Sequence, residues 1–511
     1  MIDEKFVNQN DIPYINEITV AVIMDPFTYN SFNYEFNTVV LEPSNWLNKF
    51  KENDIDLLFV ESAWHGISDK CIINGVAIEK VDQPWNGKVH TNLNSDEENR
   101  GDLFDIIRYC NENKIPTVFW NKEDPTSFDD ERFNFVDTAL YFDYIFTTDE
   151  DIIPRYNAKG HDKVYSLLFA SQLSLYNPIE EKKRSNDIIF AGSWYNQFAE
   201  RSEKMRLIFD KILDSSLNLK IYNRESGSYD PNRQYPEKYQ EYVNPRVPLD
   251  KMPSTYKESK YALNINTVTG SHTMFARRVY ELMSSNTFVF SNYSVGIDDL
   301  FKNRVIFLDE IDSLEIDEEE INKIRETNLY EVLENHNYYQ RFKHILDIIG
   351  FKYKEHAKNV SIFYEYDDTI KLSDIIEDFN SINYYYKTCY IISDHESSCE
   401  SIGLDENKFK FILIKHLPYI EEILDEKDYF LVRDLSSSLD KDFIKKSLLH
   451  YQYLDNSFGV KEEKGKYENK FFIVESEDYK NIMFNNHKLN EVTKKINEFE
   501  DNNTYFKVLK I

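Results

Sequence analysis

Hydrophobic residues in the first third of the chain occur as short continuous runs separated by amphipathic segments. Buried strands are predicted at residues 18–24, 38–41, 57–60, 117–120 and 144–147, with helices at 46–50 and 103–110. Continuous apolar runs that alternate with helices are typical of βαβ units in a mostly parallel sheet. We therefore predict a first Rossmann-like domain over residues 1–178.

The same pattern begins again after the polar segment 179–187, which we interpret as a linker. Strands are predicted at residues 188–192, 219–223, 261–266, 287–292 and 305–309, with helices at 200–212 and 277–284. A helical stretch follows over residues 315–349. The pattern predicts a second Rossmann-like domain, residues 187–350, and a ligand where the carboxyl ends of the strands of the two domains face each other.

A third α/β series occupies residues 355–511. Its predicted strands are 360–366, 386–393, 409–414 and 428–434, with a helix at 370–379. This series follows the other two after a helical segment rather than a long polar tract. The fold class is therefore α/β throughout, with two Rossmann-like domains followed by a smaller one.

Composition and charge restrict the possible functions. The 511 residues are 41% hydrophobic and 15% aromatic, which excludes general disorder, and the net charge of −30 argues against nucleic acid as a partner. The 4 cysteines are dispersed without a CxxC pair, so neither a zinc site nor a disulfide framework is indicated, and reduced thiols are expected. The polar, acidic start and the lack of a run of ~20 apolar residues predict no signal peptide and no transmembrane segment. We expect a cytoplasmic protein, and its oligomeric state is left open.

The segment of residues 271–292 carries the most distinctive chemistry. It comprises a polar loop, an amphipathic helix with the single acid Glu281, and a short buried strand. Such a loop is expected to present backbone N–H groups and the positive end of a helix to an anion. Arg277 and Arg278 then lie where they can meet phosphate, and Glu281 can accept hydrogen bonds from a ribose diol. The alternative for all three is a solvated helix charge.

This segment, RRVYELMSSNTFVFSN (277–292), resembles the donor-site region of GT-B glycosyltransferases of the CgeB-like, spore-maturation type. Further blocks resemble that group in the same order: VAVIMDPFTYNSF (20–32), DLLFVESAWHG (56–66), IPTVFWNKEDPTSF (115–128), FDYIFTTDED (142–151) and IIFAGSWY (188–195). The resemblance implies a GT-B fold, two Rossmann-like domains facing across a cleft, and a hexosyltransferase activity. It also implies a UDP-sugar as donor substrate without a required metal or other cofactor. The implied setting is bacterial cell-surface glycan synthesis, with a glycan or protein acceptor.

The resemblance also implies a donor site in the second domain, with Arg278 and Glu281 as catalytic residues. The residues expected to contact the nucleotide sugar are Gly192, Ser193, Arg201, Tyr222, Asn223, Asn266, Ser271, Thr273, Met274, Phe275, Arg278 and Glu281. Related enzymes often carry a Glu-x7-Glu pair, but Thr273 stands where the first acid would be. Thr273 or a backbone N–H would have to replace that carboxylate. Asn264 and Asn266 share one strand face, so a ligand role and a capping role both remain open.

Polar residues that follow the predicted strands of the first domain are candidates for the acceptor site. They are Asp25, Glu61, Trp64, His65, Lys122, Glu123 and Asp124, all near the carboxyl edge of a parallel sheet. The imidazole of histidine ordinarily titrates near neutrality, which suits a residue such as His65 to act as a general base or a hydrogen-bond donor. Structural alternatives remain: a loop histidine, a turn at Asp124 before Pro125, and a helix cap at Asp149.

The third domain resembles the nucleotide-binding half of a family 2-type GT-A glycosyltransferase. Such domains place a DxD motif after the last of these strands, where two carboxylates hold a divalent ion. The corresponding residues are Asp434, Leu435 and Ser436, so one carboxylate remains. We expect this domain to fold without transferring sugar, and Asp440 to cap the helix near Phe443. Docking of the acceptor, binding of a partner and shielding of apolar surface are its expected roles.

The leading hypothesis is therefore a metal-independent glycosyltransferase. The first alternative is a UDP-sugar 2-epimerase, which shares the two-domain fold. The second alternative is a non-catalytic pseudo-glycosyltransferase that stabilises an enzyme partner, which the missing first Glu and the incomplete DxD motif favour.

Overall fold

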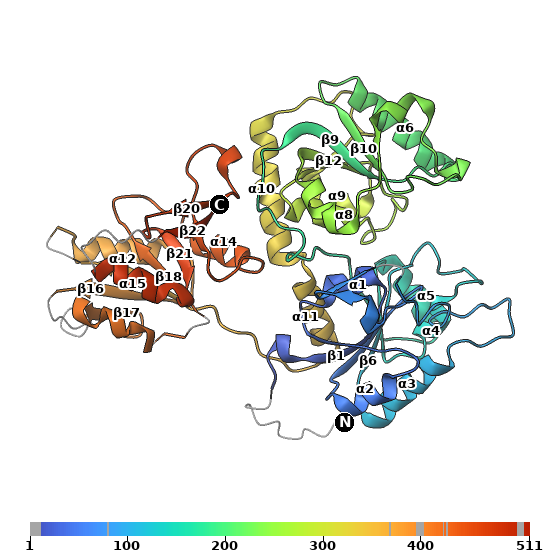
Figure 1. The fold of residues 1–511 in the computed structure, drawn as a ribbon, viewed down its shortest axis with the longest axis horizontal. Helices are drawn as coiled ribbons and strands as arrows, with labels where there is room; N and C mark the ends of the chain where they lie inside the picture. The colour runs from blue at the N-terminus through green and yellow to red at the C-terminus, as the bar shows by residue number, and fades with distance from the viewer. Residues whose placement is uncertain are drawn as a thin grey trace. The chain divides into compact units, whose positions relative to one another are not determined.

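The computed structural model describes residues 12–78, 81–366, 369–394, 403–422, 424–425, 428–497 and 505–511. The chain forms two compact units (Figure 1). The N-terminal unit comprises Met1–Tyr176 and Arg184–Glu355, and the C-terminal unit comprises Asn177–Lys183 and His356–Ile511. Each unit is built from helices around parallel or mixed sheets, which confirms the predicted α/β class.

The first sheet of the N-terminal unit has six parallel strands in the order β2-β1-β3-β6-β7-β8. They are β1 (Thr19–Ile23), β2 (Asn37–Val40), β3 (Leu57–Glu61), β6 (Thr117–Asn121), β7 (Tyr144–Thr147) and β8 (Val164–Ser166). The accompanying helices are α1 (Pro26–Phe32), α2 (Trp46–Glu52), α3 (Gly101–Asn113), α4 (Phe135–Ala139) and α5 (Ile153–Ala158). Strands β3 and β6 are buried at every position, as their continuous apolar runs predicted.

The second sheet also has six parallel strands, in the order β11-β10-β9-β12-β13-β14. They are β9 (Ser185–Gly192), β10 (Leu219–Asn223), β11 (Val243–Asn244), β12 (Ser259–Asn264), β13 (Phe288–Ser291) and β14 (Ile306–Phe307). Its helices are α6 (Ala199–Leu213), α7 (Met252–Tyr256), α8 (Arg278–Ser284) and α9 (Val295–Phe301). Helix α8 is buried from Val279 to its end, so Glu281 is not on a solvated face.

The predicted helical stretch forms two helices that serve different cores. Helix α10 (Glu318–Asn335) places Ile321 and Val332 in the two cores of the second sheet. Helix α11 (Tyr338–Ile349) returns to the first sheet, where Phe342 packs on Phe36 with ring centroids 4.6 Å apart. Figure 1 shows α11 beside α1 and β1. Residues 338–349 thus complete the core of the first sheet although they follow the second.

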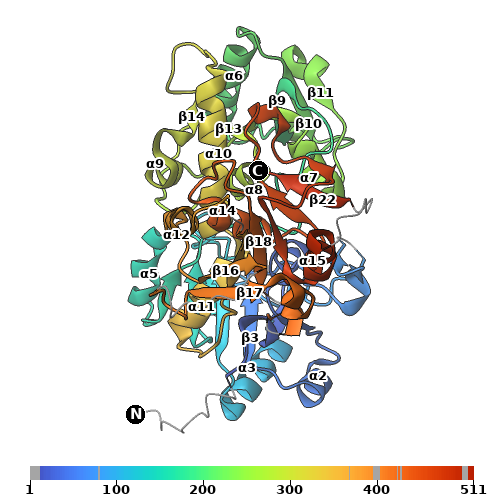
Figure 2. The ribbon, with the colours of Figure 1, turned by 90° about the vertical axis from the view of Figure 1, so that its left-hand side faces the viewer.

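The described residues of the C-terminal unit form one mixed sheet of eight strands, in the order β17-β16-β15-β18-β21-β19-β22-β20. Figure 2 labels β16, β17, β18 and β22 of this sheet. The strands are β15 (Val360–Glu365), β16 (Lys387–Ser393), β17 (Phe409–Leu413), β18 (Tyr429–Arg433), β19 (Gly459–Lys461), β20 (Ile473–Ser476), β21 (Ile482–Asn485) and β22 (Phe506–Lys510). Strands β15 to β18 are parallel, and β21 joins β18 antiparallel. The helices are α12 (Leu372–Ser381), α14 (Phe443–His450) and α15 (Leu489–Asn497). The GT-A-like identity of this unit stays a prediction.

Two further expectations concern cysteines and membrane spans. Cys71, Cys110 and Cys389 are buried free thiols, whereas Cys399 lies outside the described residues. Within the described part of the chain, no helix has the length and apolar character needed to cross a bilayer.

Candidate functional site

The carboxyl end of β9 brings the backbone close to two arginines. The carbonyl oxygen of Ser193 accepts hydrogen bonds from both terminal nitrogens of Arg201, each at 3.3 Å, and that of Gly192 accepts one from the Tyr235 hydroxyl at 2.9 Å. A Cβ at Gly192 would lie 2.5 Å from the ring of Phe190, so this position has no room for a side chain. Glycine therefore lets a ligand approach the strand end closely.

Three polar atoms at this strand end are buried without a partner. The hydroxyl oxygen of Ser193 and the Nε atoms of Arg201 and Arg278 make no hydrogen bond to any described residue. Burial, and to a lesser degree the neighbouring charge of Arg278, lowers the pKa of Arg201. Buried donors of this kind nearly always have partners in native proteins. Their arrangement here indicates a place for an anionic ligand.

Glu281 lies on the adjacent helix α8 and is 4% exposed. Its carboxylate is 3.3 Å from Nε of Arg277 and accepts a hydrogen bond of 3.3 Å from the Tyr256 hydroxyl. Burial, reinforced by the charge of Glu281, raises the pKa of Tyr256 to about 12, so this hydroxyl remains a donor at neutral pH. The alternative of a solvated helix charge is thus wrong for Glu281.

A cavity of about 660 Å³ lies between the two sheets of the N-terminal unit. The second sheet contributes Arg277, Glu281 and the loop that contains Arg246 and Leu249. Phe27, on α1 beside the first sheet, also lines the cavity, and its ring centroid lies 3.4 Å from the guanidinium carbon of Arg277. Sequence reasoning missed the segment 246–253, which leads into α7, although its prolines at 248 and 253 were a signal of an ordered turn.

The loop before α8 does not present its N–H groups as predicted. The N–H groups of Thr273 and Met274 donate to the Ser271 hydroxyl, that of Ala276 donates to Oδ1 of Asn266, and that of His272 donates to Asp151. The prediction that these groups face an anion is therefore wrong in this structure. A serine two or three residues upstream competes for backbone N–H groups, as in other ST-turns.

Ser271 and Thr273 instead connect the two halves of the N-terminal unit. The Ser271 hydroxyl donates to Oδ1 of Asp149 at 2.7 Å. The Thr273 hydroxyl donates to the carbonyl of Thr148 at 3.0 Å and accepts from the N–H of Glu150 at 2.9 Å. Asp149 also accepts from the N–H of Asp151, which confirms the capping role that its sequence position suggested.

The remaining donor-site candidates have partners within the second domain. The side chains of Asn264 and Asn266 bond to each other at 3.1 Å, and the N–H of Asn266 donates to Asn292 at 2.8 Å. The Tyr222 hydroxyl donates to Glu258 at 2.6 Å, and Oδ1 of Asn223 accepts from the N–H of Glu225 at 3.0 Å. Met274 is partly buried, and Phe275 packs in the core against Tyr280. These side chains are placed to shape the strand ends.

In the first domain, Asp25 organises the SAWHG loop. Its carboxylate accepts backbone hydrogen bonds from Trp64 at 2.8 Å, His65 at 3.0 Å and Gly66 at 2.8 Å. Gly66 has a φ of +65°, and a Cβ there would lie 2.6 Å from Trp85, so only glycine fits. Asp25 therefore positions His65 by holding the backbone of this loop.

Lys122 and Glu61 form a buried charged pair beneath that loop. Their charged atoms are 2.9 Å apart, and Glu61 also accepts a hydrogen bond from the Thr28 hydroxyl. Burial raises the pKa of Glu61 to about 7, against the opposing charge of Lys122. Sequence reasoning did not include Thr28 in this group, since nothing in its local pattern marks it.

Trp64, His65 and Glu123 lie at the outer end of the same sheet. The indole N–H of Trp64 donates to Glu123 at 3.1 Å, and Nδ1 of the exposed His65 is 3.1 Å from Oδ1 of Asn86. With Oδ1 of Asn86 as the acceptor, the His65 tautomer that makes this hydrogen bond carries its proton on Nδ1 and leaves the Nε2 lone pair open. Among the described residues, no contact joins His65 to Arg278 or Glu281.

Asp124 is fully buried, unlike the other acceptor candidates. Its carboxylate accepts hydrogen bonds from Thr147 and Tyr156 at 3.0 Å and from Asn121 at 3.1 Å. Burial raises its pKa to about 7. With its oxygen atoms engaged inside the sheet, Asp124 is placed to brace the strand ends.

The carboxylates of both units are not grouped as metal ligands in the part of the chain that the structure describes. Over the described ranges, no group of three His, Cys, Asp or Glu side chains is arranged to hold a metal ion. At the DxD position, the two oxygens of Asp434 accept from the N–H and the hydroxyl of Ser436 at 2.9 and 2.8 Å. These bonds lower the pKa of Asp434. Asp440 accepts from the N–H of Asp442, but Asp442 is the N-cap of α14 and, within the described chain, the helix has no side-chain cap hydrogen bond, so the expectation that Asp440 caps it is wrong.

Residues 201–347 match a family model described as glycosyl transferase-like. The match spans α6 to α11 and includes Arg201, Arg278 and Glu281. It confirms the expectation of a glycosyltransferase-type enzyme domain in this part of the chain. No curated protein is significantly similar to the chain.

Several solved structures are similar over about two thirds of the chain. The N-terminal domain of trehalose-6-phosphate phosphatase from Candida albicans is 10% identical, covers 66% of this chain and 97% of its own, and has a TM-score of 0.38. Phage T4 BGT in complex with UDP and Mn²⁺ is 11% identical, covers 65% of this chain and 99% of its own, and has a TM-score of 0.36. A glycosyltransferase from Rickettsia africae is 11% identical, covers 66% of this chain and 98% of its own, and has a TM-score of 0.39. Such scores do not extend the activities of those proteins to this chain.

Two parallel sheets that enclose a cavity agree with the GT-B fold that the sequence predicted. The domain limits of 1–178, 187–350 and 355–511 stay a proposal.

Proposed function

We propose that this protein is a metal-independent glycosyltransferase of the CgeB-like type that transfers a hexosyl group from a UDP-sugar to a glycan or protein acceptor. The observation that carries the proposal is the set of buried, unpartnered atoms of Ser193, Arg201 and Arg278. Among the described residues, neither arginine is paired with a carboxylate. A diphosphate supplies the acceptor oxygens that these donors lack, and guanidinium groups bind such oxygens well.

The donor would then occupy the second domain from the end of β9 to the cavity beside α8. Gly192 and Ser193 would approach the diphosphate, and Arg201 and Arg278 would neutralise it. Glu281 lines the 660 Å³ cavity, where its carboxylate can accept hydrogen bonds from the ribose hydroxyls in exchange for that of Tyr256. The volume falls within the range of about 300–1,000 Å³ that is usual for small-molecule sites.

The acceptor would approach from the first domain, past Trp64, His65 and Glu123. In the transfer, the bond between the anomeric carbon and the diphosphate breaks and a bond from the acceptor oxygen to that carbon forms. UDP leaves with the bonding electrons, and Arg201 and Arg278 stabilise its charge in place of a metal ion. Nε2 of His65 takes the proton of the acceptor hydroxyl, because Asn86 holds the other ring nitrogen.

A thermal-shift panel of UDP, GDP, TDP and CMP tests the donor site. UDP is expected to raise the melting temperature of the wild-type protein more than the other nucleotides, because a ligand stabilises the state that it binds. Glu281→Ala should lose most of that shift. Glu203→Ala, which removes an acid of α6 that is exposed and pairs with Arg206, should keep it.

Two results contradict the proposal. One is an equal UDP shift in Glu281→Ala and Glu203→Ala. The other is conversion of UDP-GlcNAc to its epimer without any acceptor, which would indicate a 2-epimerase.

A further inference from the structure

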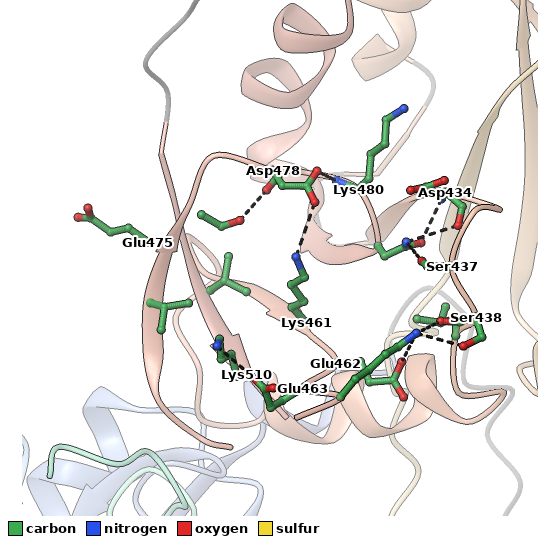
Figure 3. Close-up of a pocket in the computed structure, with 16 residues that line it drawn as sticks. Asp434, Ser437, Ser438, Lys461, Glu462, Glu463, Glu475, Asp478, Lys480 and Lys510 are labelled. Atoms are coloured by element: carbon green, nitrogen blue, oxygen red, sulfur yellow. Dashed lines mark hydrogen bonds and ion pairs between the residues drawn. The ribbon is translucent and has the colours of Figure 1, made fainter. Parts of the chain in front are cut away.

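The C-terminal unit contains a cavity of about 570 Å³ at the carboxyl end of β18 (Figure 3). Its wall is formed by the turn that follows Asp434, by the end of β19, by β20 and by β22. In open α/β sheets, ligands bind at the carboxyl ends of the parallel strands. The volume also falls within the range of about 300–1,000 Å³ typical of small-molecule sites.

The charges of the lining residues do not favour an anion. The wall carries five acidic and four basic residues. Lys510 is 2.8 Å from Glu463, Lys461 is 3.6 Å from Asp478, and Lys480 is 2.9 Å from Glu365. Lys464 lies 3.9 Å from Glu462 and donates to the Ser438 hydroxyl at 3.2 Å. A phosphate would have to break one of these ion pairs to bind.

A metal-bound sugar diphosphate fits no better. Both oxygens of Asp434 are engaged by Ser436, and the described residues form no three-ligand group here. The side-chain nitrogen of Asn481 donates to the Ser437 hydroxyl at 2.8 Å and thereby fixes the turn beside Asp434.

The polar groups that remain suit a neutral ligand rich in hydroxyls. A hydroxyl group both donates and accepts, so it can bond to a carboxylate and to a neighbouring ammonium without disrupting their ion pair. Oε2 of Glu462 is buried and has no hydrogen-bond partner among the described residues. Figure 3 shows Lys461 pointing to Asp478 across the cavity, with Glu475 directed away from the other labelled residues. Leu439, Val474 and Val508 add an apolar surface for the C–H face of a sugar ring.

We propose that this cavity binds a neutral saccharide, through the paired carboxylates and ammonium groups around Lys461 and Glu462. The C-terminal unit is then a glycan-docking module. This inference goes beyond the transferase proposal and does not depend on it, because the cavity is lined by residues of the C-terminal unit alone.

The test uses the full-length protein and saturation-transfer NMR titrations with maltose, cellobiose and N,N′-diacetylchitobiose. Lys461→Ala/Glu462→Ala removes a pair of polar groups without a change of net charge, and Ser438→Trp fills the cavity while keeping its charges. The matched control is Lys488→Ala/Glu491→Ala. It removes an ion pair whose charged atoms are 2.8 Å apart, with Glu491 on α15 and Lys488 just before it, and neither residue lines the cavity.

At least one disaccharide should bind the wild-type protein, and both cavity variants should lower its affinity roughly tenfold or more, since hydrogen bonds to charged groups are lost. The control should bind like the wild type. The proposal is overturned if no disaccharide binds, or if the cavity variants bind as well as the control. It is also overturned if inorganic phosphate or UDP binding, measured in parallel, is what the cavity variants lose.

Discussion

The carboxyl edges of the two parallel sheets in the N-terminal unit differ in how their charged side chains are hydrogen-bonded. At the first sheet, the side chains of Asp25, Glu61 and Asp124 all accept hydrogen bonds from neighbouring groups. At the second sheet, the buried Nε atoms of Arg201 and Arg278 make no hydrogen bond within the described chain. Both edges lie where parallel sheets bind ligands, so location alone does not distinguish them.

The difference teaches that hydrogen-bonding state separates positioning residues from ligand-binding residues. A polar group whose partners are all present contributes to the stability of the fold, and removing one partner leaves the others unpaired. A buried group without partners lowers stability until a ligand arrives. The two edges should therefore respond in opposite ways to substitution.

The largest expected effect is a loss of stability at the first sheet. Lys122→Met removes the cation 2.9 Å from buried Glu61. At pH 8, where Glu61 is ionised, this should lower the free energy of unfolding by about 3–5 kcal/mol, as measured by urea denaturation. Lys49→Met, which breaks a surface pair with Asp69, should cost no more than about 1 kcal/mol. Equal losses in the two variants would contradict the comparison.

At the second sheet, Arg278→Ala should weaken UDP binding without weakening the fold. We expect the dissociation constant of UDP to rise roughly 100-fold, equivalent to about 2.7 kcal/mol, in isothermal titration. Without nucleotide, the melting temperature should stay the same or rise, because a buried group that lacks a partner has been removed. Arg206→Ala on α6 is the control, since Arg206 is half-buried and pairs with the exposed Glu203 at 3.4 Å. A fall in the melting temperature of nucleotide-free Arg278→Ala would place this arginine among the structural residues.

The third prediction uses the pH dependence of stability. Burial raises the pKa of Asp124 from 3.8 to about 7, so the folded state holds this proton more tightly than the unfolded state. The resulting stability is complete below the unfolded pKa and is lost as the pH rises through the folded pKa. Between pH 5 and pH 8 this should remove about 2–3 kcal/mol.

Asp124→Asn lacks this titration. The melting temperature of the variant, relative to that of the wild type, should therefore increase as the pH rises. Glu61 titrates in both proteins, and its contribution cancels in the difference. Asp129→Asn, which alters an exposed partner of Arg155, should follow the wild type. A constant difference between Asp124→Asn and wild type across this pH range would contradict the assigned pKa.

The sequence by itself determined the elements and their order. Runs such as residues 117–120 and 188–192 became strands β6 and β9 because continuous apolar residues must be buried on both faces of a sheet. The chemistry-bearing positions after these strands also followed from the sequence, since parallel strands end at a common edge. Arg201, Arg278 and Glu281 lie on the helices that follow these strands, and the resemblance to GT-B glycosyltransferases indicated them.

Only the tertiary structure decided which of these residues have partners. Asp149 and Ser271 are 122 residues apart, Asn86 reaches His65 from another loop, and α11 returns to the first sheet across the whole second domain. No local pattern encodes such pairings, because the periodicity of a segment specifies its buried face but not the surface that covers it. The same reason explains why the N–H groups before α8 were expected to be free, although Ser271 and Asn266 satisfy them in the folded chain.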